Sequence, residues 1–250
     1  MDFFNVSWWT ESQNEVFPLA FGIIIVVAIA LGLLLKNKSE KIKNIPLLII
    51  TVLIIVAEIV KQVRAIEAGY GFWSIPLHYC STFLIWFSMA TFFKGKVKDA
   101  GQKISLLTGL AFLVGFIIGP STIIGNATSN LTWSWSNFGN LHTFYYHFAV
   151  VLFVALQIAF KHPFPTIKDL KRIGIPFFSW MIVSAIVANL LNVNFSNLLY
   201  SNIGFMDSIR INYGYPIYLA SMFIAFFSIF VGILLIGTLI DKIRKKFKKS

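Results

Sequence analysis

The sequence predicts an all-α, polytopic membrane bundle of seven transmembrane helices, with the N-terminus outside and the C-terminus in the cytoplasm. Composition is the first observation behind this fold class: 57% of the 250 residues are hydrophobic and only 12% are charged. A soluble domain carries about a quarter of its residues as charged ones. The polar surface is therefore too small for a water-soluble particle, and we expect the lipid bilayer to be the main solvent.

Seven apolar runs are the second observation, because an α-helix needs about 20 residues to cross the hydrocarbon core. Backbone groups must be paired inside lipid, so such runs are predicted to be helical. Together they form one transmembrane domain over residues 1–250, without an internal repeat. The predicted helices are Val16–Leu35, Pro46–Ile66, Pro76–Phe93, Lys103–Gly119, Leu141–Phe160, Ile173–Leu191 and Ile217–Ile240, followed by a basic tail at residues 241–250.

Charge placement is the third observation. Eighteen of the 21 Lys and Arg residues follow every second predicted helix, with four, four, four and six in successive segments. This alternation is what the positive-inside rule demands and sets the predicted orientation. Basic runs between apolar helices are attracted to an anionic leaflet. The membrane surface therefore explains the formal charge of +11, and no nucleic-acid partner is expected.

The start of the chain, the long outer loop and the composition each add one expectation. Asp2, Glu11 and Glu15 precede the first apolar run without any basic residue, so we expect that run to remain as a helix rather than be cleaved as a signal peptide. The loop at residues 192–216 is long enough to hold a short interfacial helix. A composition rich in Lys, Ile, Phe and Asn is typical of a bacterial protein, which predicts a multi-pass protein of the bacterial plasma membrane.

No metal or other cofactor is predicted. The single cysteine, Cys80, excludes an internal disulfide and a thiolate cluster. His142 and His147 are five residues apart, about 140° around a helix, which is a poor arrangement for a metal pair. His147 is instead predicted to lie over Thr143, one turn earlier on the same helix. His162 is followed by a proline and is predicted to lie in a loop.

Ionisable residues inside a membrane helix are costly and mark function by default. Glu58 and Lys61 of the second helix are three residues apart and can pair on one helix face. The alternative is that Lys61 and Arg64 extend to the outer interface. That alternative explains Arg64 but not Glu58, which lies about two turns deeper.

The predicted topology gathers polar residues in the outer half of the membrane, because the second helix ends there and the third and fifth begin there. We expect these three helices to be neighbours around one polar pocket, with little polar material in the inner half apart from His162. The alternative is that the polar residues only hydrogen-bond helix to helix. The candidates are Glu58, Lys61, His78, Cys80, His142, His147, Asn189 and Tyr213.

The third helix is predicted to begin at Pro76, since proline suits the first turn. On that helix His78 and Cys80 would point about 200° apart, so a direct couple between them is not expected. His78 would instead share a face with Ser81 or Thr82.

Two short motifs carry a resemblance. Ile-Pro-Leu-His-Tyr-Cys at 75–80 and Phe-Tyr-Tyr-His-Phe at 144–148 each open a predicted helix. This pattern resembles the bacterial YwaF-like integral membrane proteins, which are similar to the eukaryotic transmembrane protein 164 family. That family is regarded as an acyltransferase acting on ether phospholipids through a membrane cysteine and a histidine.

By this resemblance the proposed histidine falls on His147. The family cysteine aligns with Leu77 and the residue after it with His78, whereas Cys80 lies three residues further along. Cys80 could replace the family nucleophile in space, and the sequence leaves that question open.

Three classes of function remain. A lipid acyltransferase or acyl-ester hydrolase would use Cys80 as nucleophile and His147 as base, with His78 or Asn189 stabilising the oxyanion. A transporter would hold a solute or relay protons at Glu58 and Lys61, and an accessory protein would use the polar residues only for packing. The expected partners are membrane lipids, including a phospholipid or acyl substrate, and the oligomeric state is left open.

Overall fold

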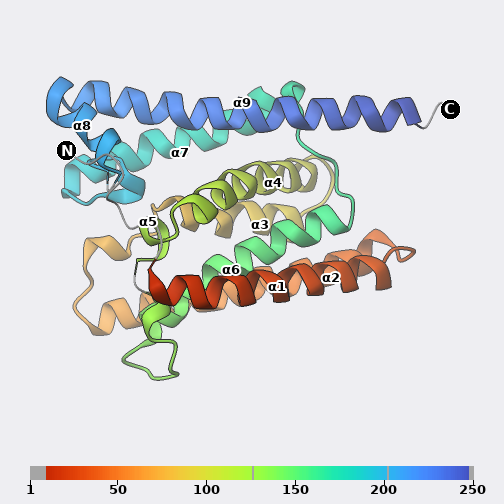
Figure 1. Ribbon diagram of the computed structural model, residues 1–250, viewed down its shortest axis with the longest axis horizontal. Coiled ribbons are helices and arrows are strands. Elements are labelled where there is room, and N and C mark those ends of the chain that lie inside the picture. Colours follow the sequence, from red (N-terminus) through yellow and green to blue (C-terminus); the bar gives the residue numbers. More distant parts are fainter. Residues whose placement is uncertain (1–9, 126, 202, 248–250) are drawn as a thin grey trace. The chain divides into compact units, whose positions relative to one another are not determined.

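The computed structural model describes residues 10–125, 127–201 and 203–247, and its regular elements in these ranges are helical (Figure 1). The chain divides into two compact units. Among these described residues, we call 10–71 and 83–163 the α6 unit, and 72–82 and 164–247 the α9 unit. Each unit is described by itself.

Six described helices are long and apolar enough to span a membrane, and a seventh apolar helical stretch, Tyr79–Phe92, is shorter. The protein is therefore an all-α, multi-pass integral membrane protein. The six long helices are α1 (Glu11–Leu34), α2 (Glu40–Glu67), α4 (Gly95–Ile118), α6 (Phe138–Ala159), α7 (Leu170–Leu191) and α9 (Tyr215–Phe247). The shorter elements are α3 (Thr82–Phe92), α5 (Ser121–Ile124) and α8 (Gly204–Tyr213), with 3₁₀ turns η1 (Phe72–Ser74), η2 (Tyr79–Ser81), η3 (Ala127–Ser129), η4 (Ile167–Asp169) and η5 (Phe195–Asn197).

Two predicted helices differ at their starts: the fourth begins at Gly95, eight residues before the predicted Lys103, and the third begins later than predicted. It was expected from Pro76, but η2 and α3 together begin only at Tyr79, and the backbone of His78 is extended (φ −71°, ψ 153°). The reason lies in the backbone donors: the Leu77 N–H donates to the Ile75 carbonyl at 2.8 Å, and the Tyr79 N–H donates to the Ser196 hydroxyl. The prediction for residues 76–78 was wrong, and with it the helical-face argument for His78.

α6 is the centre of the α6 unit, where it packs against α1, α2 and α4. Half of its 22 residues are buried, whereas α1 presents long apolar side chains outward, as a lipid-facing helix does. Aromatic rings make the contacts: Phe153 of α6 stacks on Phe87 of α3 with ring centroids 3.6 Å apart. Phe17 of α1 meets Phe148 of α6 at 5.0 Å.

Small residues allow the closest helix approaches in this unit. A Cβ added at Gly101 of α4 would lie 2.5 Å from the backbone nitrogen of Ala90 in α3. A Cβ at Gly109 would lie 2.2 Å from the side chain of Val154 in α6. In a membrane, where lipid tails are as apolar as leucine, such close packing is a main source of helix association.

The α9 unit packs α9 against α8 and α7. The short helix expected within residues 192–216 is present as α8, which precedes α9 directly. η4 is held to α9 by a hydrogen bond from the Ile167 N–H to the Thr238 hydroxyl at 3.0 Å. Phe177 of α7 and Phe230 of α9 pack with centroids 4.4 Å apart.

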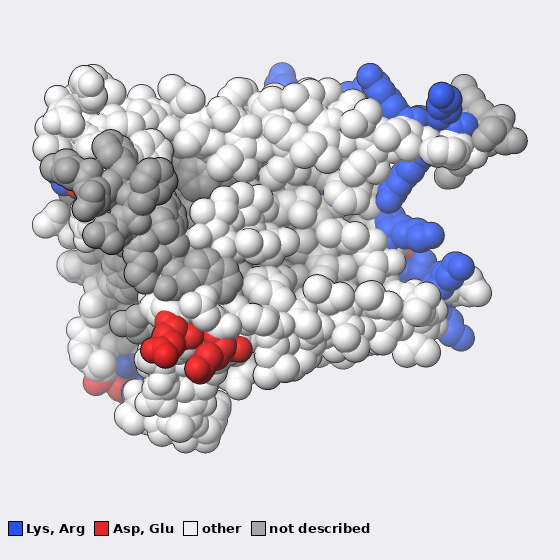
Figure 2. All heavy atoms as spheres, in the orientation of Figure 1, with Lys and Arg blue, Asp and Glu red and all other residues white. Residues whose placement is uncertain are grey.

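Charge is distributed unevenly along α1. Acidic side chains lie over the start of this helix, and basic side chains gather over the connection from α1 to α2 at its other end (Figure 2). The opposite ends of one apolar helix therefore carry opposite charge, as expected for a helix that crosses a membrane. Which end faces the cytoplasm stays a prediction.

Replacement of Gly101 by alanine tests the contact between α3 and α4. The added methyl group would clash with the backbone of α3, which cannot rotate away, so we expect the variant to lose about 1–3 kcal/mol of stability. Thermal unfolding in detergent measures this. Gly115→Ala, on the same helix but with ordinary contact distances, is the matched control and should unfold at or slightly above the wild-type temperature. Equal unfolding temperatures for both variants would contradict the packing argument.

Candidate functional site

The predicted site residues fall into both units. Glu58, Lys61, His142 and His147 lie in the α6 unit, and His78, Cys80, Asn189 and Tyr213 lie in the α9 unit. The single pocket expected from the topology therefore stays a prediction, and the two groups are described in turn. Within the described residues, no cluster of three His, Cys, Asp or Glu side chains is arranged to hold a metal ion.

The carboxylate of Glu58 is the centre of the first group. Lys61 Nζ lies 2.9 Å from its Oε1 and 3.1 Å from its Oε2, and Gln62 Nε2 donates to Oε1 at 2.7 Å. From α6, His142 Nε2 lies 3.4 Å from Oε2. The predicted pair of Glu58 and Lys61 is confirmed, and the structure adds His142 and Gln62 to it.

Burial explains why the carboxylate has so many partners. Glu58 is 7% exposed and lies nine residues before the end of α2, or about 14 Å at 1.5 Å per residue. A lone charge at such a place is very costly, so it is retained only with a counter-charge and hydrogen bonds. A carboxylate that contacts both an ammonium and an imidazole can also exchange protons with them without any backbone movement.

Two contacts hold the C-terminal part of α2, which follows this cluster along the chain. The Tyr70 hydroxyl donates to Gln62 Oε1 at 2.9 Å, and the Arg64 guanidinium lies 4.7 Å from the ring centroid of Trp135. Arg64 thus contacts the aromatic loop before α6, and its extension to the membrane interface stays a prediction. Glu58 instead contacts Lys61, Gln62 and His142, and these different partners support separate roles for Glu58 and Arg64.

His147 occupies a buried position on the same helix as His142. Its Nδ1 lies 2.6 Å from the carbonyl oxygen of Thr143, one turn earlier, as the sequence predicted. A carbonyl can only accept, so Nδ1 carries the hydrogen and the basic lone pair of the neutral ring is on Nε2. The ring is 6% exposed and lies parallel to Phe112 at 5.5 Å.

His78 and Cys80 lie on the irregular segment before α3. His78 Nε2 is 3.2 Å from the Trp73 carbonyl oxygen, and the ring packs on Trp73 at 4.3 Å and on Phe195 at 5.2 Å. Cys80 is half-buried within η2. Because the backbone of His78 is extended, His78 and Cys80 do not lie on one helix. The relative orientation of their side chains is therefore set by the loop and not by helical spacing.

Asn189 and Tyr213 have different surroundings. Asn189 Nδ2 donates to the Tyr215 hydroxyl at 2.6 Å and to the Ala185 carbonyl at 2.8 Å, which joins α7 to the start of α9. Tyr213, at the end of α8, is 66% exposed. The structure therefore assigns Asn189 a helix-joining contact and leaves Tyr213 at the surface of the α9 unit.

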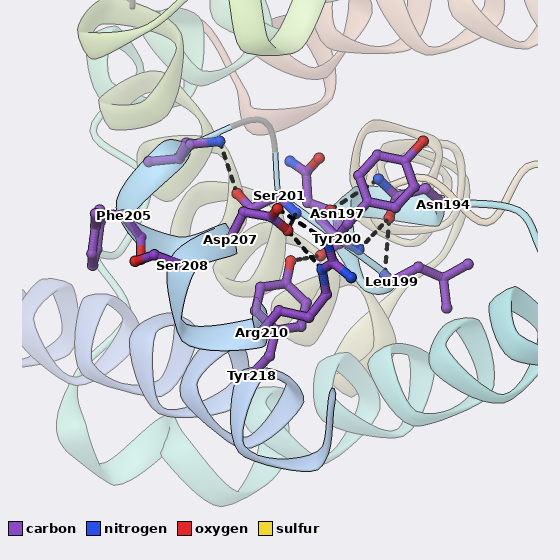
Figure 3. A network of polar contacts seen from close by, with 11 residues as sticks. Asn194, Asn197, Leu199, Tyr200, Ser201, Phe205, Asp207, Ser208, Arg210 and Tyr218 are labelled. Atoms are coloured by element: carbon purple, nitrogen blue, oxygen red, sulfur yellow. Dashed lines mark hydrogen bonds and ion pairs between the residues drawn. The ribbon is translucent and has the colours of Figure 1, made fainter. Parts of the chain in front are cut away.

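A polar network holds the loop between α7 and α9. Figure 3 shows the Asp207 carboxylate facing the Arg210 guanidinium, with N–O distances of 2.7 and 3.0 Å. The hydrogen bond from Arg210 lowers the pKa of Asp207. Asn194 closes the loop by donating to the Tyr200 carbonyl and accepting from the Leu199 N–H, both at 2.9 Å. We interpret this network as the support of a long connection rather than as a site.

One polar cluster was missed by sequence reasoning. Near the end of α6, Gln157 is fully buried; its Nε2 donates to the Gln102 carbonyl at 3.0 Å, and the Ser105 hydroxyl donates to its Oε1 at 3.2 Å. The expectation of little polar material in this half of the α6 unit was wrong. The hydroxyls were overlooked because serine and threonine can bond to their own helix, as Thr108 does to Ile104. The amide of Gln157, inside the apolar run Leu141–Phe160, was the one signal in the sequence that could have predicted this cluster.

His162 follows α6 in the predicted loop position, but it is only 5% exposed, which was not expected. Within the described part of the chain its Nδ1 has no hydrogen-bond partner. A buried polar atom without a partner is rare and indicates that something outside the chain, such as water or a ligand, completes it.

Comparison with known proteins adds one finding. A family model described as the TMEM164 family matches residues 8–235, which is nearly the whole chain. No curated protein and no solved structure matches the chain.

The Glu58 cluster predicts a specific stability pattern. Lys61→Met would leave the buried carboxylate without its ammonium partner, so we expect a loss of about 3 kcal/mol in unfolding free energy. Combining Lys61→Met with Glu58→Gln removes both charges and should recover most of this loss. Unfolding in detergent measures all variants, with Lys41→Met, an exposed lysine of α2, as control. A double variant as unstable as the single one would show that the ion pair does not carry the effect.

Proposed function

The chain belongs to the TMEM164 family, and from this premise we propose that it is a membrane-embedded acyl-lipid enzyme in which His147 is the general base. The substrate class is a membrane phospholipid, and the reaction is acyl transfer or ester hydrolysis. The observation that carries the proposal is the hydrogen bond from His147 Nδ1 to the Thr143 carbonyl, which orients the ring and leaves Nε2 as the basic atom.

The surroundings of His147 support this role. The ring is buried among the aromatic side chains of Phe112 and Phe116, which are apolar and limit the access of water. An oriented imidazole takes a proton from an attacking group and returns it to a leaving alcohol, which is the task of a base in acyl transfer.

Cys80 is the candidate nucleophile by resemblance. Its sulfur would form a bond to the ester carbonyl carbon, the ester C–O bond would break, and the thiol proton would leave with the released alcohol. A second alcohol, or water, would then take the acyl group and restore the thiol. His78 and Asn189 are the candidate groups that stabilise the oxyanion, although Asn189 already donates to Tyr215.

We further propose that the protein is of the bacterial YwaF-like type and lies in a bacterial plasma membrane. The N-terminus is outside, and the basic connections and the basic end of α9 are cytoplasmic. The support is the charge placement: lysines and arginines follow every second span, and acidic residues precede the first.

Mass spectrometry of membrane lipids tests the enzyme. Membranes holding the wild type should show acyl-chain remodelling, and His147→Gln should slow it about 10²–10⁴-fold because the base is lost. Cys80→Ala should abolish an acyl adduct that the wild-type thiol forms with phospholipid. Tyr145→Phe, an exposed neighbour on α6, is the matched control and should keep the wild-type rate. Lipid remodelling at the wild-type rate in both His147→Gln and Cys80→Ala would contradict the proposal.

The contacts of Glu58 favour a second candidate, a solute or proton site in a transporter. His142 and Lys61 lie on either side of one buried carboxylate, so a proton can pass between groups of α2 and α6. The remaining candidate is an accessory protein, in which the same contacts only join helices.

Proteoliposomes with an entrapped pH dye separate these two. A transporter should move protons down an imposed gradient, and Glu58→Gln should stop this movement because the amide cannot accept a proton. Glu67→Gln, an exposed carboxylate at the end of α2, is the control. Equal proton leak in wild type, Glu58→Gln and empty vesicles would exclude transport and, together with unchanged lipids, leave the accessory role.

A further inference from the structure

We propose that the end of the α6 unit around His162 is a binding site for a phosphate group, carried by an anionic phospholipid head group or by free phosphate. Its binding groups are the ammonium groups of Lys43 and Lys98 and the imidazole of His162. The site is separate from the proposed catalytic residues, because His147 lies 12 residues before the end of α6.

Three segments of the α6 unit build this site. α2 contributes Lys43 and Asn44 from its first turns, α4 contributes Lys98 from its first turn, and the segment after α6 contributes His162. Lys98 Nζ donates to Asn44 Oδ1 at 3.1 Å, and Asn44 Nδ2 donates in turn to the Thr91 carbonyl at 3.2 Å. The ammonium of Lys98 is thus held against α2 rather than left to extend into water.

The unsatisfied atom of His162 is the observation that points to a ligand. The imidazole is 95% buried, yet its Nδ1 has no hydrogen-bond partner among the residues that the structure describes. Its backbone N–H is satisfied by the Gln157 carbonyl at 3.0 Å, so the segment is held in place and only the ring nitrogen lacks a partner. A buried polar atom of this kind destabilises the fold unless a ligand or water completes it.

The charges that act on this ring show which ligand fits. Burial lowers the pKa of His162 to about 4; repulsion from Lys98 and Lys43 adds to this, and the Glu40 carboxylate opposes it. The ring is therefore neutral at neutral pH, and the charges that act on it are one carboxylate, that of Glu40, and the two ammonium groups of Lys98 and Lys43. Glu40 binds Lys43 at 3.0 Å, but its side chain is 70% exposed, so it can move aside for a stronger anion.

An anion of tetrahedral oxygens matches these groups. Lys43 and Lys98 supply ammonium donors, and a protonated His162 supplies a ring N–H, while the starts of α2 and α4 add positive helix ends. Basic pockets between transmembrane helices bind lipid head groups in this way. Because a bound anion stabilises the protonated ring, its binding raises the pKa of His162 and takes up a proton.

The test uses the full chain in a neutral detergent. Short-chain phosphatidylglycerol is titrated by calorimetry, with phosphatidylcholine of the same chain length as the zwitterionic comparison. We expect phosphatidylglycerol to bind to the wild type. Lys98→Gln and Lys43→Gln should each raise its dissociation constant about tenfold, whereas Lys41→Gln should change the dissociation constant less than about twofold. Lys41 is the matched control, because it is an exposed lysine of the same helix.

The pH profile distinguishes this site from general attraction to a basic surface. Wild-type affinity should rise as the pH is lowered from about 8 to about 5.5, with uptake of a proton, and His162→Gln should bind with a flat profile. A flat wild-type profile, or an equal effect of Lys41→Gln, would overturn the proposal, and so would a failure of both phosphatidylglycerol and phosphate to bind.

Inorganic phosphate identifies the source of the group. Competition by millimolar phosphate would support a site for the phosphate group itself, whereas binding of phosphatidylglycerol alone would support a lipid head group. Thermal unfolding of each variant without ligand confirms that weaker binding does not arise from loss of the fold. If the wild type binds phosphatidylglycerol but remodels no lipid, the proposed function is contradicted and this binding site is not.

Discussion

Inside an apolar bundle every polar group has to find its partner within the protein, and the arrangement of the α6 unit depends on this constraint. Backbone groups are satisfied by helices, but a carboxylate such as that of Glu58 needs a counter-charge and hydrogen-bond donors from its neighbours. Lys61 and Gln62 come from its own helix, and His142 comes from α6. The pairing of α2 with α6 is therefore specified by charge as well as by packing.

α6 fulfils this requirement along its whole length. Near its start His142 meets Glu58, in the middle His147 is oriented by Thr143, and near its end Gln157 binds Gln102 and Ser105. Between these polar positions the helix packs through phenylalanines and close approaches such as that of Val154 to Gly109. One central helix thus carries both the candidate base and the contacts that hold it still, which an oriented catalytic group needs.

The two ends of the α6 unit suit different roles. At one end the Glu58 carboxylate accepts hydrogen bonds from Lys61 and Gln62 and lies 3.4 Å from His142 Nε2, so the chain itself compensates the buried charge of this cluster. At the other end the ammonium groups of Lys43 and Lys98 act electrostatically on the buried ring of His162, whose Nδ1 has no partner in the described part of the chain. The contrast is the physical reason for assigning an external anion to the second end and not to the first.

Sequence by itself determined the membrane character and six of the seven predicted spans, because hydropathy and span length are local properties that tertiary packing does not change. The seventh predicted span is a shorter apolar stretch, Tyr79–Phe92, in the structure. The family also follows from the sequence, which the family model matches over residues 8–235. It also determined the pair of Glu58 with Lys61 and the position of His147 over Thr143, since both follow from helical spacing.

Only the tertiary structure decided the contacts between residues far apart in the chain. It brought His142 to Glu58, Gln157 to Ser105 and Lys98 to Asn44, and no periodicity encodes such pairings. It also decided that residues 76–78 are not helical, because Tyr79 gives its backbone hydrogen to Ser196, 117 residues away. Local propensity favours a helix after Pro76, but a long-range hydrogen bond overrides it, and a single sequence cannot reveal that partner.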